Sequence, residues 1–335
     1  MITNNPLVSV IIPTYNVEPY LVQCLDSVNA QTYENFECII IIDGATDQSY
    51  EIAKEYCATH PKFKVFYQDN AGSGPARNNG VAHSSGDFVC FIDPDDWVES
   101  DYVETLIKEQ VRGDYDLVIS QSIARWVDST DTIIKTTQDD KPVLRFTSHE
   151  ECKEIFPEVM FVKHHLDGPI CKLFRLSIIR EQDIEFPAYR RSQDMVFNFR
   201  YYKHIHSLSV ISDHTYNIRY EYPPRPNRGR IFTGYNEIVA KIYLELSKQL
   251  TDWHLKSDYK AAFHTWSFVY LYGFLCKSVA TSTPYDYIKE EPYDTIIRKA
   301  RPILAHQKVV RIFLLLHLYG CANLVMRLIN KIKKQ

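Results

Sequence analysis

The sequence lacks the features that mark several large classes of protein. No run of about 20 residues is both uncharged and predominantly apolar, so we expect no membrane-spanning helix. The N-terminus has no basic region ahead of an apolar stretch, so we expect no secretory signal. Lys and Arg number 38 against 42 Asp and Glu, a net charge of −4, which argues against a nucleic-acid partner. These absences indicate a cytoplasmic protein.

Cysteine is present, but not in the patterns of a disulfide framework or a metal site. The eight cysteines are scattered along the chain and include no C-x-x-C pair. Several lie in apolar runs, such as Cys90 between Phe88 and Ile92, where cysteine acts as a small hydrophobic side chain. We expect reduced cysteines, which fits a cytosolic setting.

The residues that are present have the composition of an ordinary globular protein. They are 45% hydrophobic and 24% charged, and 335 residues are enough for two domains of about 150 residues each. A proline-rich stretch from Pro223 to Pro226 predicts the boundary between them. We therefore predict a first domain over 1–225 and a mainly helical second domain over 226–335, in which Ile238, Ile242 and Leu246 recur at helical spacing.

The first 120 residues alternate apolar strands with helix-like segments. Strands are predicted over 8–15, 36–42, 63–67, 87–92 and 117–120, with helices over 18–30 and 47–57 among them. Continuous apolar strands between helices favour an α/β fold with a mostly parallel sheet covered on both faces. Ligands of such sheets bind beyond the carboxyl ends of the strands, and the early strands here end in polar residues.

The strongest local signal is the segment that runs from Phe91 to Asp96 and contains three carboxylates. Such a cluster at the end of a strand is unfavourable unless a cation or hydrogen-bond donors compensate it. Asp93 and Asp95 straddle Pro94, so both can reach one point and bind Mn²⁺ or Mg²⁺, with phosphate oxygens completing the coordination shell. The alternative is a plain turn in which Asp96 is the N-cap of a helix after Trp97.

A second signal is the glycine-rich segment from Asn70 to Gly80. Glycines before a helix start bring backbone N–H groups close to an anion, and Arg77 adds a fixed cation. A nicotinamide-binding fingerprint is a poor match, because the glycines follow the third strand and Arg77 occupies the third glycine position. A plain turn is the alternative here as well.

Taken together, these segments resemble glycosyltransferase family 2, the inverting nucleotide-sugar enzymes of the GT-A fold. The matching stretches occur in the family's order and spacing over residues 8–16, 42–47, 70–80 and 86–96. Weaker similarity continues through 171–174 and 192–197. The resemblance implies a Rossmann-like nucleotide-sugar-binding sandwich with a C-terminal helical region, and an enzyme of the bacterial surface-polysaccharide type.

The resemblance also implies a donor site. Asp43 is similar to the residue that reads uracil, Arg77 to a residue that contacts the diphosphate, and Asp95 to the direct metal ligand of the DXD motif. Asp93 would lie near the ribose and the metal. The turn formed by Pro13, Thr14 and Tyr15 is expected to border the base, and Asn16 is expected among the donor-binding residues. For Thr14 and Asn16 the alternative is that they only terminate the strand.

On the acceptor side, the resemblance implies that Asp194 is the general base. This carboxylate would take the proton of the attacking hydroxyl, and one such group suffices for a single displacement with inversion. The alternative is that Asp194 caps a helix that begins at Met195. Gln193 stands where the family usually has Glu, and three residues are expected on the acceptor side: Lys172, Gln193 and Arg219. A surface lysine and a solvated loop arginine are the alternatives for Lys172 and Arg219.

The C-terminal tail is basic and apolar. Residues 301–335 contain seven Lys and Arg but no Asp or Glu, so this segment carries +7 and the rest of the chain −11. A basic amphipathic helix is suited to the surface of an anionic membrane. The alternative is a terminal helix packed on the helical domain, with a solvated basic end.

These observations predict a metal-dependent inverting glycosyltransferase with a UDP-sugar donor that carries a hexose or N-acetylhexosamine. The acceptor would be a hydroxyl of a growing surface glycan (capsule, O-antigen or wall polymer), free or as a lipid-linked oligosaccharide at the inner face of the membrane. One rival is a sugar-phosphate nucleotidyltransferase, but that class needs a glycine-rich loop where Pro13 to Asn16 stand. The other rival is a non-catalytic nucleotide-sugar-binding scaffold, against which the intact aspartates argue.

Overall fold

A computed structural model describes residues 5–138, 140, 142–223, 234–255, 257–278 and 286–332. The chain divides into two compact units, one formed by Met1–Lys153 and His165–Pro226 and the other by Glu154–His164 and Asn227–Gln335. The predicted boundary at 225/226 lies outside the described residues, so its position stays a prediction. The second unit also takes in the short segment Glu154–His164, which sequence analysis had placed wholly in the first domain.

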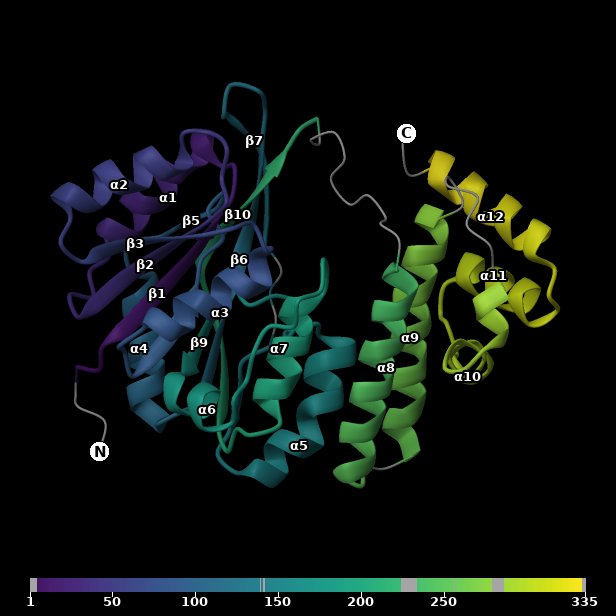
Figure 1. Cartoon of the computed structure of the whole chain (residues 1–335). Coiled ribbons are helices and arrows are strands. Elements are labelled where there is room, and N and C mark those ends of the chain that lie inside the picture. The colour runs from purple at the N-terminus through teal and green to yellow at the C-terminus, as the bar shows by residue number, and fades with distance from the viewer. Residues whose placement is uncertain are drawn as a thin grey trace. The chain divides into compact units, whose positions relative to one another are not determined.

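The first unit is built on a ten-stranded mixed sheet of the described residues (Figure 1). Four neighbouring strands are parallel, in the order β3 (Phe63–Gln68), β2 (Phe36–Asp43), β1 (Val8–Thr14) and β4 (Phe88–Phe91). Next come the antiparallel β9 (Lys172–Arg175), then β6 (Leu117–Val127) and β10 (Leu208–Glu221), which are parallel to each other. The remaining strands are antiparallel to their neighbours: β5 (Trp97–Val98), β7 (Ile133–Gln138) and β8 (Leu144–Phe146). The predicted α/β class is confirmed.

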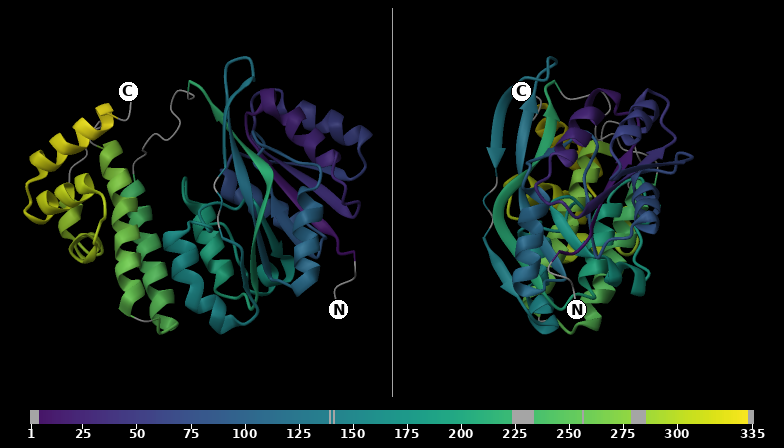
Figure 2. Two further views of the ribbon diagram at one scale, coloured as in Figure 1. Left: turned by 180° about the vertical axis from the view of Figure 1, so that it is seen from behind. Right: turned by 90° about the vertical axis from the view of Figure 1, so that its left-hand side faces the viewer.

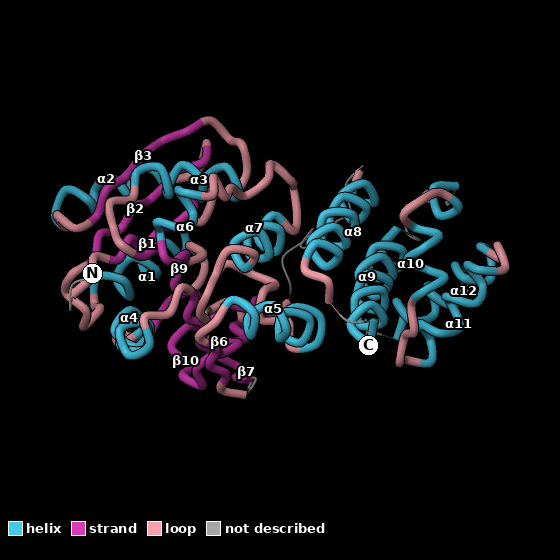
Figure 3. Tube along the Cα trace, turned by 90° about the horizontal axis from the view of Figure 1, so that it is seen from below, coloured by secondary structure: helices cyan, strands magenta, loops and turns pink. Residues whose placement is uncertain are grey.

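Helices cover both faces of this sheet. One face carries α1 (Glu18–Asn29), α2 (Ser49–Thr59) and α4 (Tyr102–Gly113), and the other carries α3 (Ser73–His83), α6 (Leu176–Glu181) and α7 (Gln193–Tyr202). Figure 3 shows α1 and α4 on one side of the strands and α3, α6 and α7 on the other. Strands covered on both faces become fully buried, which explains why every residue of β1 and β2 is apolar or hidden from solvent.

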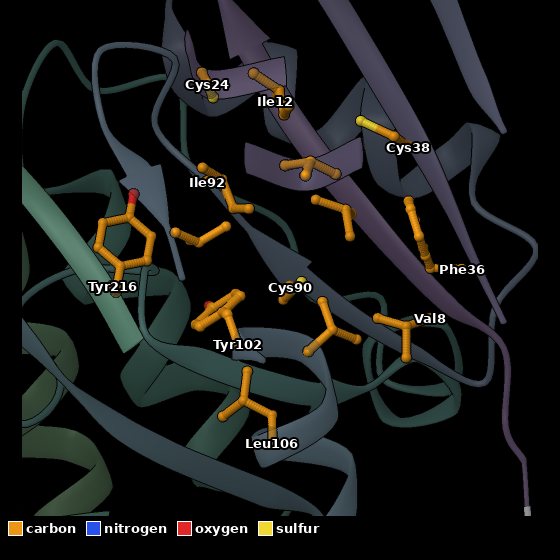
Figure 4. Packing of buried hydrophobic residues seen from close by; sticks show 14 of the residues in the cluster. Val8, Ile12, Cys24, Phe36, Cys38, Cys90, Ile92, Tyr102, Leu106 and Tyr216 are labelled. Atoms are coloured by element: carbon orange, nitrogen blue, oxygen red, sulfur yellow. The ribbon is translucent and has the colours of Figure 1, made fainter. Parts of the chain in front are cut away.

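The core between β1, α1 and α4 is shown in Figure 4. Val8 and Ile12 of β1 pack with Cys24 of α1 and with Tyr102 and Leu106 of α4. No disulfide joins any of the eight cysteines, all of which lie among the described residues. Six of them are buried, whereas Cys57 is half-buried and Cys321 is exposed.

The opposite face brings α3 very close to β1. A Cβ atom on Gly80 would lie 2.4 Å from Cγ2 of Ile11, so only glycine allows this approach. Arg77 lies one turn earlier on the same helix. The close packing of α3 therefore fixes where the guanidinium of Arg77 meets the sheet.

The second unit is helical, as predicted. Its long hairpin consists of α8 (Tyr235–Asp252) and α9 (Ser257–Ser278), which lie side by side in both Figure 1 and Figure 2. Ile238, Ile242 and Leu246 form the buried stripe of α8. The shorter elements are α5 (His149–Pro157), whose last turn joins this unit, η1 (Glu158–Val162), η2 (Asp286–Lys289), α10 (Tyr293–Lys299), α11 (Ala305–Leu315) and α12 (Tyr319–Ile332). Among the described residues, each helix is too short or too polar to cross a bilayer.

Candidate active site

The candidate site lies at the carboxyl edge of the parallel strands. Asp43 ends β2, Asp93 follows β4, and Thr14 ends β1, which lies between those two strands in the sheet. Because parallel strands end at the same edge, the fold brings these polar residues together there. Arg77 on α3 and Asp194 on α7 reach the same edge from one face.

The guanidinium of Arg77 connects the two halves of the site. Its Nη2 donates to Oδ1 of Asp93 and its Nη1 to Oδ1 of Asp194, each at 2.7 Å. The side chain is buried, and it stacks over the ring of Phe186 with 5.5 Å between the guanidinium carbon and the ring centre. Burial lowers the pKa of Arg77, but the charges of Asp194 and Asp93 outweigh burial and raise it. Nε of Arg77 is a buried donor with no hydrogen-bond partner among the described residues.

Asp194 lies in the first turn of α7, where the positive end of the helix dipole favours a carboxylate. Burial raises the pKa of Asp194 above its usual value; the charge of Asp93 also raises it, while Arg77 and Lys172 oppose the shift. The alternative N-cap role is wrong, because α7 begins at Gln193 and Ser192 occupies the N-cap position. Asp194 therefore holds Arg77 instead of capping a helix that starts at Met195.

Asp96 is not the N-cap of a helix after Trp97, which was the alternative for this residue. Trp97 and Val98 form β5, and α4 begins only at Tyr102. The buried Asp96 instead accepts hydrogen bonds from the Tyr216 hydroxyl at 3.0 Å and from the backbone N–H of Arg219 at 2.8 Å. Burial raises the pKa of Asp96 well above its usual value, and the charges of Asp93 and Asp95 raise it further.

Asp93 and Asp95 are the partly exposed carboxylates of this turn. Within the described part of the chain, no group of three or more His, Cys, Asp or Glu side chains is arranged to hold a metal ion. A divalent cation here would thus have two carboxylates from the protein and would need further oxygens from its ligand. That donor set fits Mg²⁺ or Mn²⁺, which at phosphate sites are held by one or two carboxylates together with phosphate oxygens.

Asp43 anchors the glycine-rich loop. Its carboxylate accepts hydrogen bonds from Nε2 of Gln68 and from the backbone N–H groups of Ala71 and Gly72, each at 2.8 Å. Gly72 has a φ of 98°, which favours glycine at this turn. The expected role of Asp43 in reading the base stays a prediction, and the observed bonds add that Asp43 shapes the loop before α3.

The four donor-binding residues expected at the end of β1 differ in exposure. Pro13 and Thr14 are buried, and the Thr14 hydroxyl donates to the backbone oxygen of Ile12 at 3.3 Å. Asn16, in a left-handed conformation with a φ of 48°, accepts from the backbone N–H of Thr46 at 2.7 Å. These bonds support the structural alternative for Thr14 and Asn16. Tyr15 is 48% exposed, so its ring is the one that presents a surface to a ligand.

Lys172 is buried, so the alternative of a surface lysine is wrong. Its Nζ donates to the backbone oxygens of Gly168 at 2.6 Å and Ile170 at 3.2 Å. Gln193 is buried beside α3, where its Nε2 donates to the hydroxyl of Ser73 at 2.7 Å. Oε1 of Gln193 is buried and has no hydrogen-bond partner among the described residues.

Arg219 is also buried, so it is not a solvated loop arginine. Its Nε donates to the backbone oxygen of Asp95 at 2.9 Å, and its other nitrogens contact Asp131 and Gln23. Its guanidinium lies over the ring of Trp97, 5.0 Å from the ring centre. Arg219 thus fixes the turn that carries Asp95, and its expected acceptor role stays a prediction.

Sequence analysis missed Tyr216. Its hydroxyl donates to Asp96 and accepts from the backbone N–H of Asp93 at 3.0 Å, so it holds both ends of the acidic turn. The residue lies in the middle of β10, and only the pairing of β10 with β5 brings it to this turn. No local pattern around Tyr216 signals that contact.

Comparison with known proteins places the chain in a family. The sequence profile of the family described as Glycosyl transferase family 2 matches residues 9–181. The putative glycosyltransferase EpsH of Bacillus subtilis is 35% identical over 221 residues, which cover 64% of this chain and 61% of EpsH. The poly(ribitol-phosphate) beta-N-acetylglucosaminyltransferase TarS of Staphylococcus aureus is 27% identical over 214 residues, which cover 62% of this chain and 34% of TarS. The matched region therefore spans less than two thirds of either relative.

Solved structures share the fold. Residues 1–349 of TarS from S. aureus in complex with UDP-GlcNAc superpose with a TM-score of 0.64 at 17% identity, covering 97% of this chain and 91% of that one. A mannosyltransferase from Pyrobaculum calidifontis, in complex with GDP-Man and Mn²⁺, gives a TM-score of 0.51 at 15% identity, covering 98% of this chain and 88% of that one.

Proposed function

Because the chain belongs to glycosyltransferase family 2, we propose that it transfers a hexose or N-acetylhexosamine from a UDP-sugar to a hydroxyl of a growing surface glycan. Two observations support the nucleotide and the acceptor class. A structural neighbour was crystallised with UDP-GlcNAc, and a relative acts on poly(ribitol-phosphate) according to its name. The reaction would be a single displacement with inversion, with Asp194 as the base.

The observation that carries this proposal is the bridge between Asp93, Arg77 and Asp194. A single displacement needs a base close to the acceptor hydroxyl and positive charge close to the departing diphosphate. Here one buried cation touches a carboxylate on the strand edge and a carboxylate on α7. An anomeric carbon bound beside this bridge would meet both requirements.

Each residue then has a defined task in the proposed reaction. Asp194, in its ionised form, accepts the proton of the attacking hydroxyl, and its raised pKa makes it a stronger base than an ordinary aspartate. Arg77 places positive charge and an unpaired Nε donor beside the diphosphate. Asp43 accepts from N3–H of uracil, and Tyr15 borders the base. Mn²⁺ or Mg²⁺, held by Asp93 and Asp95, supplies Lewis-acid stabilisation of the negative charge on the leaving UDP when bound.

On the acceptor side, we propose a direct role for Gln193 and positioning roles for two others. Oε1 of Gln193 is a buried acceptor without a partner among the described residues, so it suits a hydroxyl donor from the acceptor sugar. Lys172 donates to backbone oxygens of residues 168 and 170, and Nε of Arg219 donates to the backbone oxygen of Asp95. They would act on the reaction by holding residues 168–170 and Asp95 in place.

We further propose that the enzyme works at the cytoplasmic face of the membrane, where a lipid-linked acceptor would be found. The tail was expected either to bind a membrane surface or to pack on the helical domain, and the structure has features that suit each alternative. Val310 and Leu314 of α11 and Met326 of α12 are buried in the helical unit, while Leu324 and Leu328 are exposed on the other face of α12. Lys333 and Lys334 of the predicted tail lie outside the described residues.

The direct test is release of UDP, measured by mass spectrometry, from a panel of UDP-sugars with Mn²⁺ and a glycan acceptor. We expect Asp194→Asn to keep the donor affinity of the wild type and to lower kcat by about 10²–10⁴-fold. Asp101→Asn, an exposed aspartate at the start of α4, is the matched control and should transfer normally. Near-normal kcat in Asp194→Asn would remove it as the base, and UDP release from none of the donors would contradict the proposed reaction.

A further inference from the structure

An open cavity of about 1060 Å³ lies in the second unit, and the described residues that line it all belong to that unit. It is formed where α9, α10, the loop after α10 and α11 meet, and α10 contacts both α9 and α11. Figure 2 shows these helices in yellow and green. The volume is at the upper end of the range for small-molecule sites, about 300–1,000 Å³, so it can hold more than a single small ion.

The lining of this cavity, which we call the basic cavity, carries one sign of charge. Of the twelve described residues that line it, six are Lys or Arg, a seventh is His264, and none is acidic. The cations come from separate elements: Lys260 from α9, Lys299 and Arg301 from the end of α10 and the following loop, and Lys308 from α11. A fold that brings like charges together in this way gains stability when an anion binds among them.

Most of this charge is uncompensated. Arg298 pairs with Asp294 at 2.6 Å, but none of Lys260, Lys299, Arg301 and Lys308 forms an ion pair with a described carboxylate. These positive charges also affect the pKa of a histidine in the same lining. Burial lowers the pKa of His264, and the charges of Lys299 and Lys260 lower it further.

Arg311 gives the basic cavity a fixed donor. Its Nε donates to the backbone oxygen of Ile297 at 2.7 Å and its Nη2 to that of Arg298 at 2.5 Å, so these bonds hold the guanidinium at the wall. Burial lowers the pKa of Arg311, and the charge of Arg301 lowers it further. An arginine held in this way presents its remaining donors in one direction, as recognition of phosphate requires.

The rim of the cavity is apolar. Ile303 is 82% exposed and Ile312 is 50% exposed, and both line the basic cavity. A smaller cavity of about 170 Å³ shares Lys260, His264 and Lys299 with it and continues between α8 and α9. The apolar side chains of Leu250 and Phe263 line this smaller cavity together with hydroxyl-bearing residues of α8. The surroundings thus suit a ligand whose anionic group is attached to a larger, partly apolar body.

We propose that the basic cavity is a binding site for phosphate oxyanions, taking a ligand with at least two negative charges such as a diphosphate or phosphodiester group. Tetrahedral phosphate offers several acceptor oxygens at once, which matches cations that converge from three elements. The phosphate can be carried by a membrane lipid or by a soluble phosphorylated molecule. The site lies wholly in the helical unit, so it binds independently of the proposed transfer reaction.

The test uses the full chain without added nucleotide or divalent metal, and comparison of the variants separates binding in the basic cavity from binding at the donor site. Inorganic tripolyphosphate is titrated by calorimetry against the wild type and Lys260→Ala/Arg301→Ala. Lys248→Ala/Arg327→Ala is the matched control, because it removes two exposed positive charges of the same unit from α8 and α12, outside the cavity. Lys260→Arg/Arg301→Lys preserves the charge, and thermal unfolding verifies that each variant is folded.

We expect the cavity variant to bind tripolyphosphate at least about tenfold more weakly, while the control and the charge-preserving variant keep the wild-type affinity. Equal affinity in the cavity variant, or an equal loss in the control, would overturn the proposal in favour of diffuse surface charge. Tighter binding of a single-stranded oligonucleotide would overturn it in favour of nucleic acid.

A second arm distinguishes the two sources of phosphate. Vesicles of phosphatidylcholine alone are compared with vesicles of phosphatidylcholine and phosphatidic acid by co-sedimentation. Binding to the phosphatidic acid vesicles that the cavity variant lacks and that tripolyphosphate displaces would indicate that the ligand is a lipid headgroup. Binding of tripolyphosphate without binding to vesicles would support a soluble ligand, and binding of neither probe by the wild type would overturn the site. None of these outcomes depends on whether UDP-sugar is turned over.

Discussion

Asp93 and Asp194 accept hydrogen bonds from different nitrogens of the same guanidinium, each at 2.7 Å. Asp93 follows β4 and Asp194 lies in the first turn of α7, so Arg77 joins the donor edge of the sheet to the helix that carries the proposed base. With Asp95 beside them, the carboxylates outnumber this cation. A diphosphate approaching such a site is repelled unless a divalent cation enters with it. Donor and metal should therefore bind together.

The first prediction concerns the bridge itself. Arg77→Met keeps the length of the side chain but leaves Asp93 and Asp194 without their shared partner. We expect the free energy of unfolding in urea to fall by about 2–3 kcal/mol. Removing one partner of a fully buried ion pair costs about 3–5 kcal/mol. The loss should be smaller here because Asp93 is 34% and Asp194 27% exposed. Affinity for UDP-sugar, measured by calorimetry, should fall as well.

Two variants act as controls for this bridge. Arg77→Lys keeps the charge but lacks the planar fork that reaches both carboxylates, so it should restore only part of the stability. Arg112→Met removes an exposed arginine, whose contact with Glu109 is 3.6 Å long, and should change stability by less than about 0.5 kcal/mol. If Arg77→Met and Arg112→Met were equally stable, the bridge would have no structural role.

The second prediction concerns the metal. Asp95→Ala removes one of the two carboxylates available to the cation, so the diphosphate loses its counter-charge. We expect calorimetry to show no Mn²⁺-dependent binding of UDP-sugar by this variant, and chelation of the metal should have the same effect on the wild type. Asp101→Ala, an exposed aspartate just beyond the turn, should bind as the wild type does. Wild-type affinity that survives chelation would exclude the proposed coupling of donor and metal.

The sequence predicts the parts of this site that depend on neighbouring residues along the chain. It does not predict contacts between residues that are far apart in the sequence. The strand ends at Asp43, Asp93 and Asp95 follow from local patterns of apolar residues, and the strand order brings these residues to one edge of the sheet, where the candidate site lies. Asp96 is different, because an aspartate before a helical pattern favours an N-cap role locally. The pairing of Trp97 with Asn217 in β10 overrides that preference and buries Asp96 beside Tyr216.

The contacts of Arg77 with Asp93 and Asp194 also lie beyond local reasoning. Resemblance to a family suggested separate roles for the three residues, but no sequence pattern predicted that they form one bridge. The same holds for the antiparallel strand β9, which separates β4 from β6 in a sheet that the sequence predicts to be mostly parallel. Such arrangements arise from tertiary packing, which a pattern of a few residues does not encode.

The third prediction concerns Asp43. In Asp43→Asn an amide NH₂ replaces one carboxylate oxygen and faces donors of Gln68, Ala71 or Gly72 instead of accepting from them. We expect a loss of about 1–3 kcal/mol in the free energy of unfolding and at least about tenfold weaker binding of UDP. Hydrogen exchange should also become faster at the amides of Ala71 and Gly72. Unchanged UDP affinity with faster exchange would limit Asp43 to a structural role.

The fourth prediction uses the pH dependence of stability. The folded-state pKa of Asp96 is raised by burial, so the native state binds this proton more tightly than the unfolded chain, in which the pKa is about 3.9. Above about pH 4 the unfolded chain releases this proton while the folded protein retains it, so stability falls as the pH rises toward the folded-state pKa. Asp96→Asn cannot ionise. Urea unfolding should show its stability rising relative to the wild type as the pH increases from 4.

Asp101→Asn is the control for this measurement, since its exposed side chain makes no capping hydrogen bond. Its stability relative to the wild type should not rise in the same way. An offset between Asp96→Asn and the wild type that is the same at every pH would show that Asp96 stays ionised in the folded protein.

The last prediction separates the two roles of the C-terminal helices. Deleting residues 309–335 would remove Val310, Leu314 and Met326 from the core of the helical unit, so loss of membrane binding after deletion would be ambiguous. Leu324→Gln/Leu328→Gln changes only exposed side chains of α12. We expect this variant to keep its thermal stability and to co-sediment at least about tenfold more weakly with anionic vesicles, since apolar burial at the interface is lost. Leu244→Gln, an equally exposed leucine on α8, should bind vesicles as the wild type does. Equal co-sedimentation of all three proteins would leave α12 with a packing role alone.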